Sequence, residues 1–186
     1  EFVHGMCEKR QRYADTLKYF NNKGFICAIS DTRGHGENIL TNEDLGYFGE
    51  DGYKGLVDDV HEFTMYLKRE FPKLPLILIG HSMGSLIVRT YLKKNSREVD
   101  AVVISGSPSN RSFIKLGKAF LKFIALFRGW HYRSPMVEKM VNGPFEKPFA
   151  KEGIVNSLIS YSIIIALFSV RSEEHTSELQ SLLYIS

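Results

Sequence analysis

The sequence predicts an α/β protein whose mostly parallel sheet is covered by helices on both faces. Between residues 1 and 110, short apolar runs alternate with segments that carry apolar residues at helical spacing, a pattern typical of parallel strands joined by helices. One run, residues 76–79, is continuously apolar, as expected of a strand buried on both faces. The length of 186 residues and an apolar content of 44% fit one globular domain with its own core.

The N-terminal part gives a strand, a helix and a second strand. Residues 2–3 end the first strand, and apolar side chains recur at helical spacing over residues 13–20. Gly24 follows at the position where a left-handed residue commonly ends a helix. Residues 25–30 form a short apolar run, which predicts a buried strand, and residues 31–52 are polar and glycine-rich, which predicts a loop.

The next segments continue the alternation. An apolar stripe over residues 56–67 predicts a helix that ends before Pro72. The strand at residues 76–79 comes next. A helix is then expected over residues 84–94 and a further strand over residues 101–104.

After residue 110 the pattern changes to that of an amphipathic, basic helix. We interpret residues 111–160 as a helical insertion, or cap, and residues 1–110 as the sheet-containing core. The apolar stripe of this helix consists of Phe113, Leu116, Phe120, Leu121, Ile124 and Phe127, and the interleaved basic residues are Lys115, Lys118, Lys122 and Arg128.

Composition excludes several classes of function. The net charge of +3 is too small to indicate a nucleic-acid-binding surface. The two cysteines, Cys7 and Cys27, do not make a disulfide framework, so a reducing, cytoplasmic compartment is expected. Cysteine and histidine residues do not cluster at metal-ligand spacing, and we predict neither a metal nor another cofactor. The sequence makes no prediction of oligomeric state.

The chemistry centres on Gly80-His81-Ser82-Met83-Gly84, which fits the G-x-S-x-G nucleophile elbow. Three fixed positions are a weak signal alone, but a predicted buried strand precedes this one directly and a helix follows it. Such a turn lifts the serine hydroxyl out of the sheet, and the helix N-terminus favours the negative charge that develops there. The flanking glycines let neighbouring backbone approach. The alternative is a glycine-rich turn with a bystander serine.

A second motif, His4-Gly5-Met6, follows the first predicted strand. Acyl transfer needs two preorganised donors for the tetrahedral oxyanion, and the loss of one typically slows the reaction by about 10²–10³-fold. One donor is the N–H after the nucleophile, that of Met83. We expect Met6 N–H to be the other, because the turn after an earlier strand lies on the same side of the sheet.

Three motifs in this order resemble those of the α/β-hydrolase superfamily: His4-Gly5, Asp31-Thr32-Arg33-Gly34-His35-Gly36 and Gly80-His81-Ser82-Met83-Gly84. The resemblance covers residues 1 to about 160 and is strongest to the monoacylglycerol lipase and lysophospholipase branch, which is grouped with serine aminopeptidase S33-type hydrolases. It implies a three-layer αβα hydrolase fold, truncated at both ends here, with the start of a helical cap. It also implies Ser82 as nucleophile with Met6 and Met83 as oxyanion-hole donors, and a structural role in turns and ion pairs for Asp31, Arg33 and His35.

The acid and the histidine of the expected triad are missing from the pattern. The family places both after the nucleophile, in the order serine, acid, histidine. Asp100 is the only aspartate after Ser82, and it precedes its strand, which puts it at the opposite edge of the sheet. Residues 106–110 offer no carboxylate, and His131 falls in the predicted cap. We therefore assign neither role.

Both ends of the chain are expected to be incomplete or foreign. The N-terminus opens without an initiator methionine and leads directly into the His-Gly turn. Residues 171–181 match, codon for codon, the translation of a common short-read sequencing adapter, so residues 171–186 are predicted to be an artefact. This includes His175, which would otherwise be a candidate for the catalytic histidine. Residues 158–170 are apolar but too few to span a membrane, which favours a core or cap helix, and residues 161–170 could already depart from the natural frame.

The leading hypothesis is a serine hydrolase that cleaves carboxylic esters with an acyl chain, such as monoacylglycerols or lysophospholipids. The lysines of the cap helix favour a peripheral contact with a membrane surface. A peptidase or a thioesterase would use the same elbow, so these alternatives stay open. The other hypothesis is that the 186-residue chain is a non-catalytic fragment, because it lacks two members of the triad.

Overall fold

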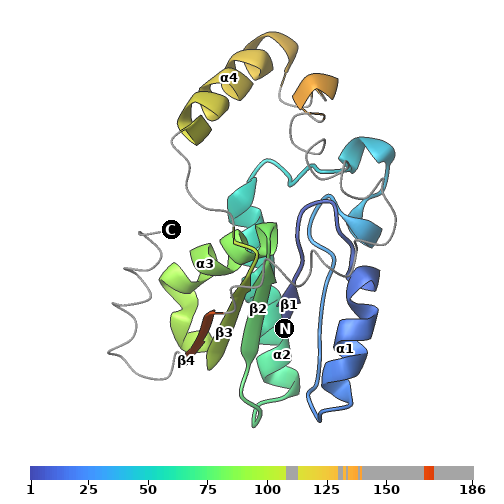
Figure 1. Ribbon diagram of the computed structural model, residues 1–186, viewed down its shortest axis with the longest axis vertical. Helices are drawn as coiled ribbons and strands as arrows, with labels where there is room; N and C mark the ends of the chain where they lie inside the picture. Colours follow the sequence, from blue (N-terminus) through green and yellow to red (C-terminus); the bar gives the residue numbers. More distant parts are fainter. Residues whose placement is uncertain (108–112, 130–131, 133, 138, 140–165, 170–186) are drawn as a thin grey trace. The chain divides into compact units, whose positions relative to one another are not determined.

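The computed structural model describes residues 1–107, 113–129, 132, 134–137, 139 and 166–169 (Figure 1). The strands are β1 Phe2–Val3, β2 Ile77–His81, β3 Ala101–Ser105 and β4 Ala166–Ser169. The helices are α1 Ala14–Asn21, α2 Tyr53–Glu70, α3 Met83–Asn95 and α4 Phe113–Arg128. Single 3-10 turns occur at Arg10–Tyr13, Gly36–Asn38, Asn42–Asp44 and Ser96–Glu98. The chain divides into two compact units, Glu1–Pro108 with Ile164–Ser186, and Ser109–Ile163.

The first unit contains the sheet, whose strands lie in the order β1-β2-β3-β4. β1 pairs with β2 and β2 pairs with β3, both in parallel, and β4 pairs with β3 in the antiparallel direction. Because parallel neighbours need a connection that crosses back over the sheet, α3 joins β2 to β3 in this role. The mostly parallel sheet expected from the sequence is confirmed.

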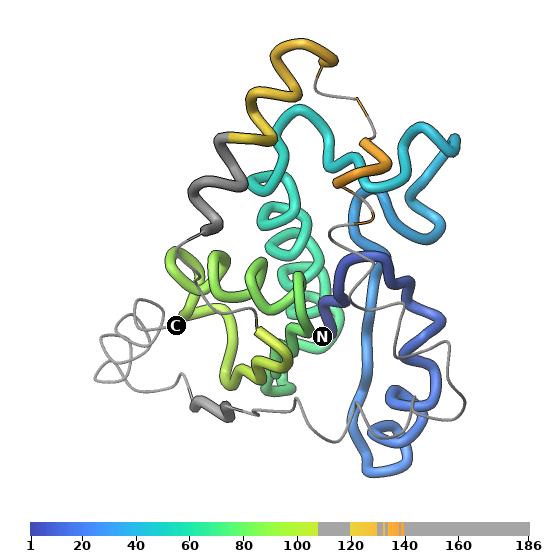
Figure 2. Tube along the Cα trace, turned by 45° about the horizontal axis from the view of Figure 1, so that its top comes forward, coloured from blue at the N-terminus to red at the C-terminus, as the bar shows by residue number. Residues whose placement is uncertain are grey.

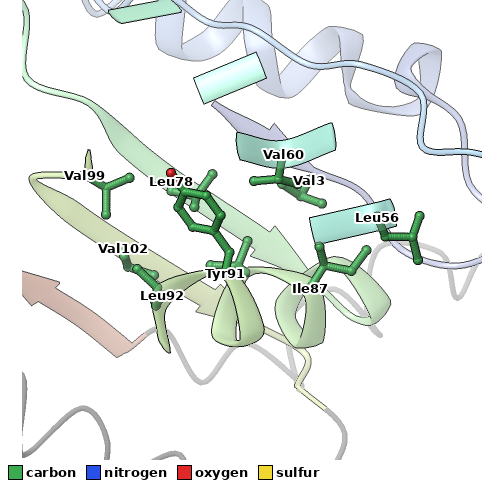
Figure 3. Packing of buried hydrophobic residues seen from close by; sticks show 10 residues of the cluster. Val3, Leu56, Val60, Leu78, Ile87, Tyr91, Leu92, Val99 and Val102 are labelled. Atoms are coloured by element: carbon green, nitrogen blue, oxygen red, sulfur yellow. The ribbon is translucent and has the colours of Figure 1, made fainter. Parts of the chain in front are cut away.

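Helices cover both faces of this sheet, and alternate residues of β1 show it. Val3 belongs to the buried core, with Leu78 and Val102 of the neighbouring strands, and α2 and α3 pack on that face (Figure 3). Phe2 points to the other face, where its ring lies 6.3 Å from that of Tyr13 and 6.0 Å from that of Phe20 in α1. The result is the three-layer αβα arrangement, and Figure 2 shows the tube of α2 beside that of α3.

The apolar stripes of α2 and α3 supply most of the core. Leu56 and Val60 come from α2, and Ile87, Val88, Tyr91 and Leu92 come from α3. Each of these side chains is at most 6% exposed. At about 25 cal/mol per Å² of apolar surface removed from water, this cluster is a major source of stability for the unit. Both helices were predicted with bounds close to those observed.

The predicted strand at residues 25–30 is wrong. Only Ile29 makes a bridge, in parallel with Phe2, and the side chains of Phe25 and Ile26 are 49% and 56% exposed. Phe2 alone pairs with this run, through its N–H to the carbonyl oxygen of Ala28 (2.9 Å) and the bridge to Ile29, so no ladder of hydrogen bonds forms along it. The apolar run therefore lies as extended chain along the edge of the sheet.

Two further expectations need correction. β2 is fully buried on one face only, at Leu78 and Gly80, while Ile77 and Ile79 are partly exposed.

In the apolar stretch 158–170 the structure has a strand at Ala166–Ser169 instead of a helix, because the free backbone groups along the outer edge of β3 can be satisfied by antiparallel pairing. The rest of that stretch and residues 171–186 lie outside the described residues.

Glu1 makes the stability of this chain depend on pH. Burial raises the pKa of its carboxyl to about 7 from an ordinary 4.5, against the hydrogen bond from Thr64 Oγ1 (2.7 Å) and the nearby N-terminal ammonium group, which both lower it. The folded state thus holds the proton of Glu1 more tightly than the unfolded state does. The stability that this proton contributes is fully present below about pH 4.5 and is lost as the pH rises through about 7.

We expect Glu1→Gln to be more stable than the unchanged chain at pH 8, by about 2–4 kcal/mol, with little difference near pH 4.5. Both chains are made with one residue ahead of position 1, so that the glutamine cannot cyclise; it then keeps an oxygen for Thr64 but has no charge to desolvate. Urea unfolding of both chains at several pH values measures this difference, and Glu37→Gln, at an exposed carboxylate, serves as the control. A difference that stays constant with pH would contradict the prediction.

Candidate active site

Ser82 occupies the junction between β2 and α3, and its backbone is strained. β2 ends at His81 and α3 begins at Met83, so a single residue makes the turn. Ser82 has φ 50° and ψ −116°, and Cys7 is the only other non-glycine residue with positive φ in the described part of the chain. Such a conformation costs about 1–3 kcal/mol and persists where the surroundings impose it. The sharp strand-to-helix turn predicted for the elbow is confirmed.

The two glycines of the elbow allow backbone segments to approach each other closely. A Cβ atom on Gly80 would lie 2.7 Å from the carbonyl oxygen of Gly84 and 2.8 Å from Cα of Ser85. A Cβ atom on Gly84 would overlap the carbonyl oxygen of Val3. These contacts bring the start of α3 directly against β1 and the turn that follows it.

That turn, residues 4–7, lies beside the serine. A Cβ atom on Gly5 would be 3.1 Å from Cβ of Ser82, so the Gly5 backbone faces the Ser82 side chain. His4 is fully buried; its Nε2 accepts the N–H of Thr32 (2.9 Å), and its Nδ1 donates to Gly5 O (2.8 Å). Met6 follows directly, and its side chain is 46% exposed. The structure thus places Met6 and Met83, the two predicted oxyanion donors, on segments that flank Ser82.

His81 and Glu8 lie beside this turn. His81 Nδ1 lies 3.3 Å from Oγ of Ser105, and its Nε2 lies 4.0 Å from Glu8 Oε1. Glu8 Oε2 accepts hydrogen bonds from the N–H of Gly5 (2.8 Å) and from the hydroxyl of Tyr13 (2.7 Å). Burial and this hydrogen bond raise the pKa of Tyr13, so the phenol stays a donor.

Sequence reasoning misses Glu8. Its signal is the spacing Gly-x-x-Glu directly after the His-Gly pair, because a carboxylate three residues on can reach back to a free N–H in a turn.

The Asp31–His35 loop has the contacts of turns and ion pairs. Asp31 is buried and accepts the N–H groups of Arg10 (2.6 Å) and Glu37 (3.0 Å). Arg33 binds Asp59 with two hydrogen bonds of 2.6 and 2.7 Å. Hydrogen bonding to Asp59 raises the pKa of Arg33, which is charged in any case. These contacts agree with the structural role predicted for the loop.

The model of the serine aminopeptidase S33 family (Hydrolase_4) matches residues 1–145 of this sequence. The chain belongs to this family. The α/β-hydrolase fold expected from the sequence is shown.

Curated relatives of this S33-family chain are lipases. It is 32% identical over 108 residues to the monoacylglycerol lipase of Mycolicibacterium smegmatis, a match that covers 58% of this chain and 37% of the relative. It is 26% identical over 119 residues to phospholipase YtpA of Bacillus subtilis, covering 63% of this chain and 42% of the relative. The chain therefore spans about two fifths of the length of these relatives.

Solved structures agree on the fold. A thermostable carboxyl esterase from Bacillus coagulans matches with a TM-score of 0.62 and 29% identity, over 69% of this chain and 41% of that one. A monoglyceride lipase from Saccharomyces cerevisiae matches with a TM-score of 0.56 and 20% identity, over 68% of this chain and 42% of that one.

In the described part of the chain, the acidic residues after Ser82 are Glu98 and Asp100, and neither lies at the Ser82 end of the sheet. Asp100 lies at the N-terminal end of β3, where its Oδ2 accepts the N–H of Leu76 (2.8 Å). Glu98 pairs with Lys68 (2.7 Å). Ser82 stands at the C-terminal end of β2, the opposite edge of the parallel sheet. His131 and His175 lie outside the described residues.

The described residues hold no group of three or more histidine, cysteine, aspartate or glutamate side chains that could bind a metal ion. Cys7 and Cys27 are both free. No helix in the described ranges combines the length and apolar character that a bilayer crossing would need.

In the second unit, α4 and the residues after it form an apolar groove of about 370 Å³. Phe123 and Phe127 pack edge to face with ring centroids 4.9 Å apart, and the guanidinium group of Arg128 lies 5.0 Å from the ring centre of Tyr132. The groove is lined by Phe123, Ile124, Phe127, Arg128, Tyr132, Ser134 and Met136.

Proposed function

We propose that this chain carries the nucleophile and the oxyanion donors of a serine hydrolase that cleaves carboxylic esters of the monoacylglycerol or lysophospholipid type. The observation that carries the proposal is the strained conformation of Ser82 between β2 and α3, with the Gly5 backbone against its side chain. A strained turn of this kind exposes a hydroxyl at the edge of the sheet. The names of the relatives supply the substrate class.

In the proposed mechanism, Ser82 Oγ attacks the ester carbonyl carbon while a histidine accepts its proton. The N–H groups of Met6 and Met83 stabilise the resulting oxyanion, and the N-terminus of α3 adds its dipole. Collapse of the tetrahedral intermediate breaks the carbon–oxygen bond of the ester, and the histidine returns the proton to the leaving alcohol. Water then hydrolyses the acyl-enzyme by the same steps, which restores Ser82.

We infer that the 186-residue chain contains neither the acid nor the histidine of the triad. The positions of Asp100 and Glu98, both engaged at the far edge of the sheet or on its flank, support this. The 186-residue chain by itself should then react only slowly. A fluorophosphonate probe tests this directly, and fast, Ser82-dependent labelling of the isolated chain would contradict it.

Within the second unit, the apolar groove offers a surface suited to an acyl chain. The side chains of Phe123, Leu126 and Phe127 are 61%, 78% and 71% exposed within α4, which also carries basic residues. Exposed aromatic side chains beside positive charge suit a peripheral contact with a lipid surface. The acyl preference and the membrane contact are both part of the proposal.

The decisive experiment compares substrates with the full-length product of the gene that encodes residues 1–160. Monoacylglycerol, lysophospholipid, acyl thioester and aminoacyl anilide are supplied at equal concentration, and kcat/KM is measured for each. We expect the two glycerol esters to be preferred by at least about tenfold, since a single apolar pocket already discriminates by this much. Preference for the anilide or the thioester would instead indicate a peptidase or a thioesterase.

A further inference from the structure

The backbone N–H groups of residues 5–7 differ in whether they have a hydrogen-bond acceptor. Gly5 N–H donates to Glu8 Oε2 (2.8 Å), and Cys7 N–H donates to His35 Nε2 (3.1 Å). Between them, Met6 N–H has no acceptor in the described part of the chain. Two of three consecutive donors are thus fixed by side chains, and the middle one has no acceptor in the described part of the chain.

The Glu8 carboxylate is itself held in place. Its Oε2 also accepts the hydroxyl of Tyr13 (2.7 Å), and its Oε1 lies 3.3 Å from Nε of Arg12. The side chain is only 10% exposed. Buried carboxylates with several donors rarely change rotamer, because each lost bond leaves a desolvated charge or donor. Glu8 therefore fixes the orientation of the peptide group that precedes Gly5 Cα.

His35 is held on the other side of the turn. Since its Nε2 accepts from Cys7, its Nδ1 carries the proton and donates to the carbonyl oxygen of Arg33 (3.0 Å). The ring stacks on Phe48, with centroids 6.0 Å apart and planes inclined by 11°. The imidazole is only 4% exposed, so it is a rigid acceptor.

The backbone between these two anchors is strained. Cys7 has φ 59°, a left-handed conformation that a non-glycine residue adopts rarely and keeps only where its surroundings impose it. The hydrogen bond from Cys7 N–H to His35 is such a constraint. Two anchored donors and a strained residue make the turn a preorganised element and not a flexible loop.

We propose that Glu8 and His35 are positioning residues that aim Met6 N–H at the reacting carbonyl oxygen. The proposal rests on the proposed function, because Met6 N–H matters only if Ser82 attacks an ester. Neither side chain touches the substrate in this scheme. Each acts through the backbone, by removing the freedom of the turn to rotate its middle peptide away from the oxyanion.

The test uses the full-length enzyme and a matched pair of substrates, a carboxylic ester and the corresponding thionoester. Sulfur accepts hydrogen bonds poorly, so the ratio of kcat/KM for the two reports on the oxyanion donors and not on folding. We expect Glu8→Ala to lower kcat for the ester by about 10- to 100-fold with KM nearly unchanged, and to lower the ester/thionoester ratio by about tenfold.

Glu8→Gln should retain activity within about threefold, because the amide oxygen still accepts from Gly5 or Tyr13. His35→Ala should shift the ratio in the same direction as Glu8→Ala. If His35→Ala does not fold, the two Glu8 variants decide the question. Glu37→Ala, which removes an exposed carboxylate that pairs with Arg10, is the control and should leave the ratio unchanged.

Equal losses for ester and thionoester in Glu8→Ala, or a change in KM alone, would overturn the positioning role while leaving the hydrolase in place. If Ser82→Ala hydrolyses the ester as fast as the unaltered enzyme, the proposed function is wrong, and so is the positioning role.

Discussion

Replacing Ser82 with alanine in the full-length enzyme is expected to lower kcat/KM for carboxylic esters by about 10⁴-fold or more. Alanine removes the only atom that can form the acyl-enzyme, and the remaining oxyanion donors provide a small residual rate. KM should change little, because a methyl group in place of a hydroxymethyl group leaves the binding surface intact. Initial rates with a chromogenic short-chain ester measure the effect.

The controls separate loss of the nucleophile from loss of the fold. Ser96→Ala alters a serine at the end of α3, far from the elbow, and should retain full activity. Ser82→Ala should also unfold at a similar or higher urea concentration, since the substitution removes none of the core contacts. A variant that is folded and still hydrolyses the ester at more than about a hundredth of the normal rate would contradict the role assigned to Ser82.

The elbow could be predicted from sequence because every level of description agrees there. The apolar run before Gly80 favours a strand and the stripe after Gly84 favours a helix. A Cβ atom at Gly80 would clash with α3, and one at Gly84 would clash with β1. The buried faces of α2 and α3 were equally predictable, since amphipathic periodicity determines which side chains face the sheet.

Other features could not be predicted because they depend on partners far along the chain. The run at residues 25–30 has the composition of a strand, but only Phe2 pairs with it. The hydrogen bond from Cys7 to His35 spans 28 residues, and no periodicity indicates it. Glu8 is local and was missed for another reason, since a single carboxylate near a turn usually has no role beyond solubility.

Gly84→Ala gives the sharpest stability test, because two principles predict opposite signs. Gly84 lies in the first turn of α3, and an alanine in a helix is favoured over glycine by up to about 1 kcal/mol. Packing predicts the reverse. The new Cβ atom would overlap Val3 O and lie 2.6 Å from Val3 C and 2.7 Å from His4 O. These are backbone atoms of β1 and the oxyanion turn, which cannot move aside as a flexible side chain could.

We expect the packing effect to dominate, with a loss of about 3 kcal/mol or more in the free energy of unfolding. Urea unfolding followed by circular dichroism measures it, and Lys93→Ala, at an exposed position of the same helix, is the control with a change within about 0.5 kcal/mol. A variant as stable as the unchanged chain would mean that β1 can separate from α3. The contact that holds the Gly5 backbone against Ser82 would then be too loose to preorganise an oxyanion hole.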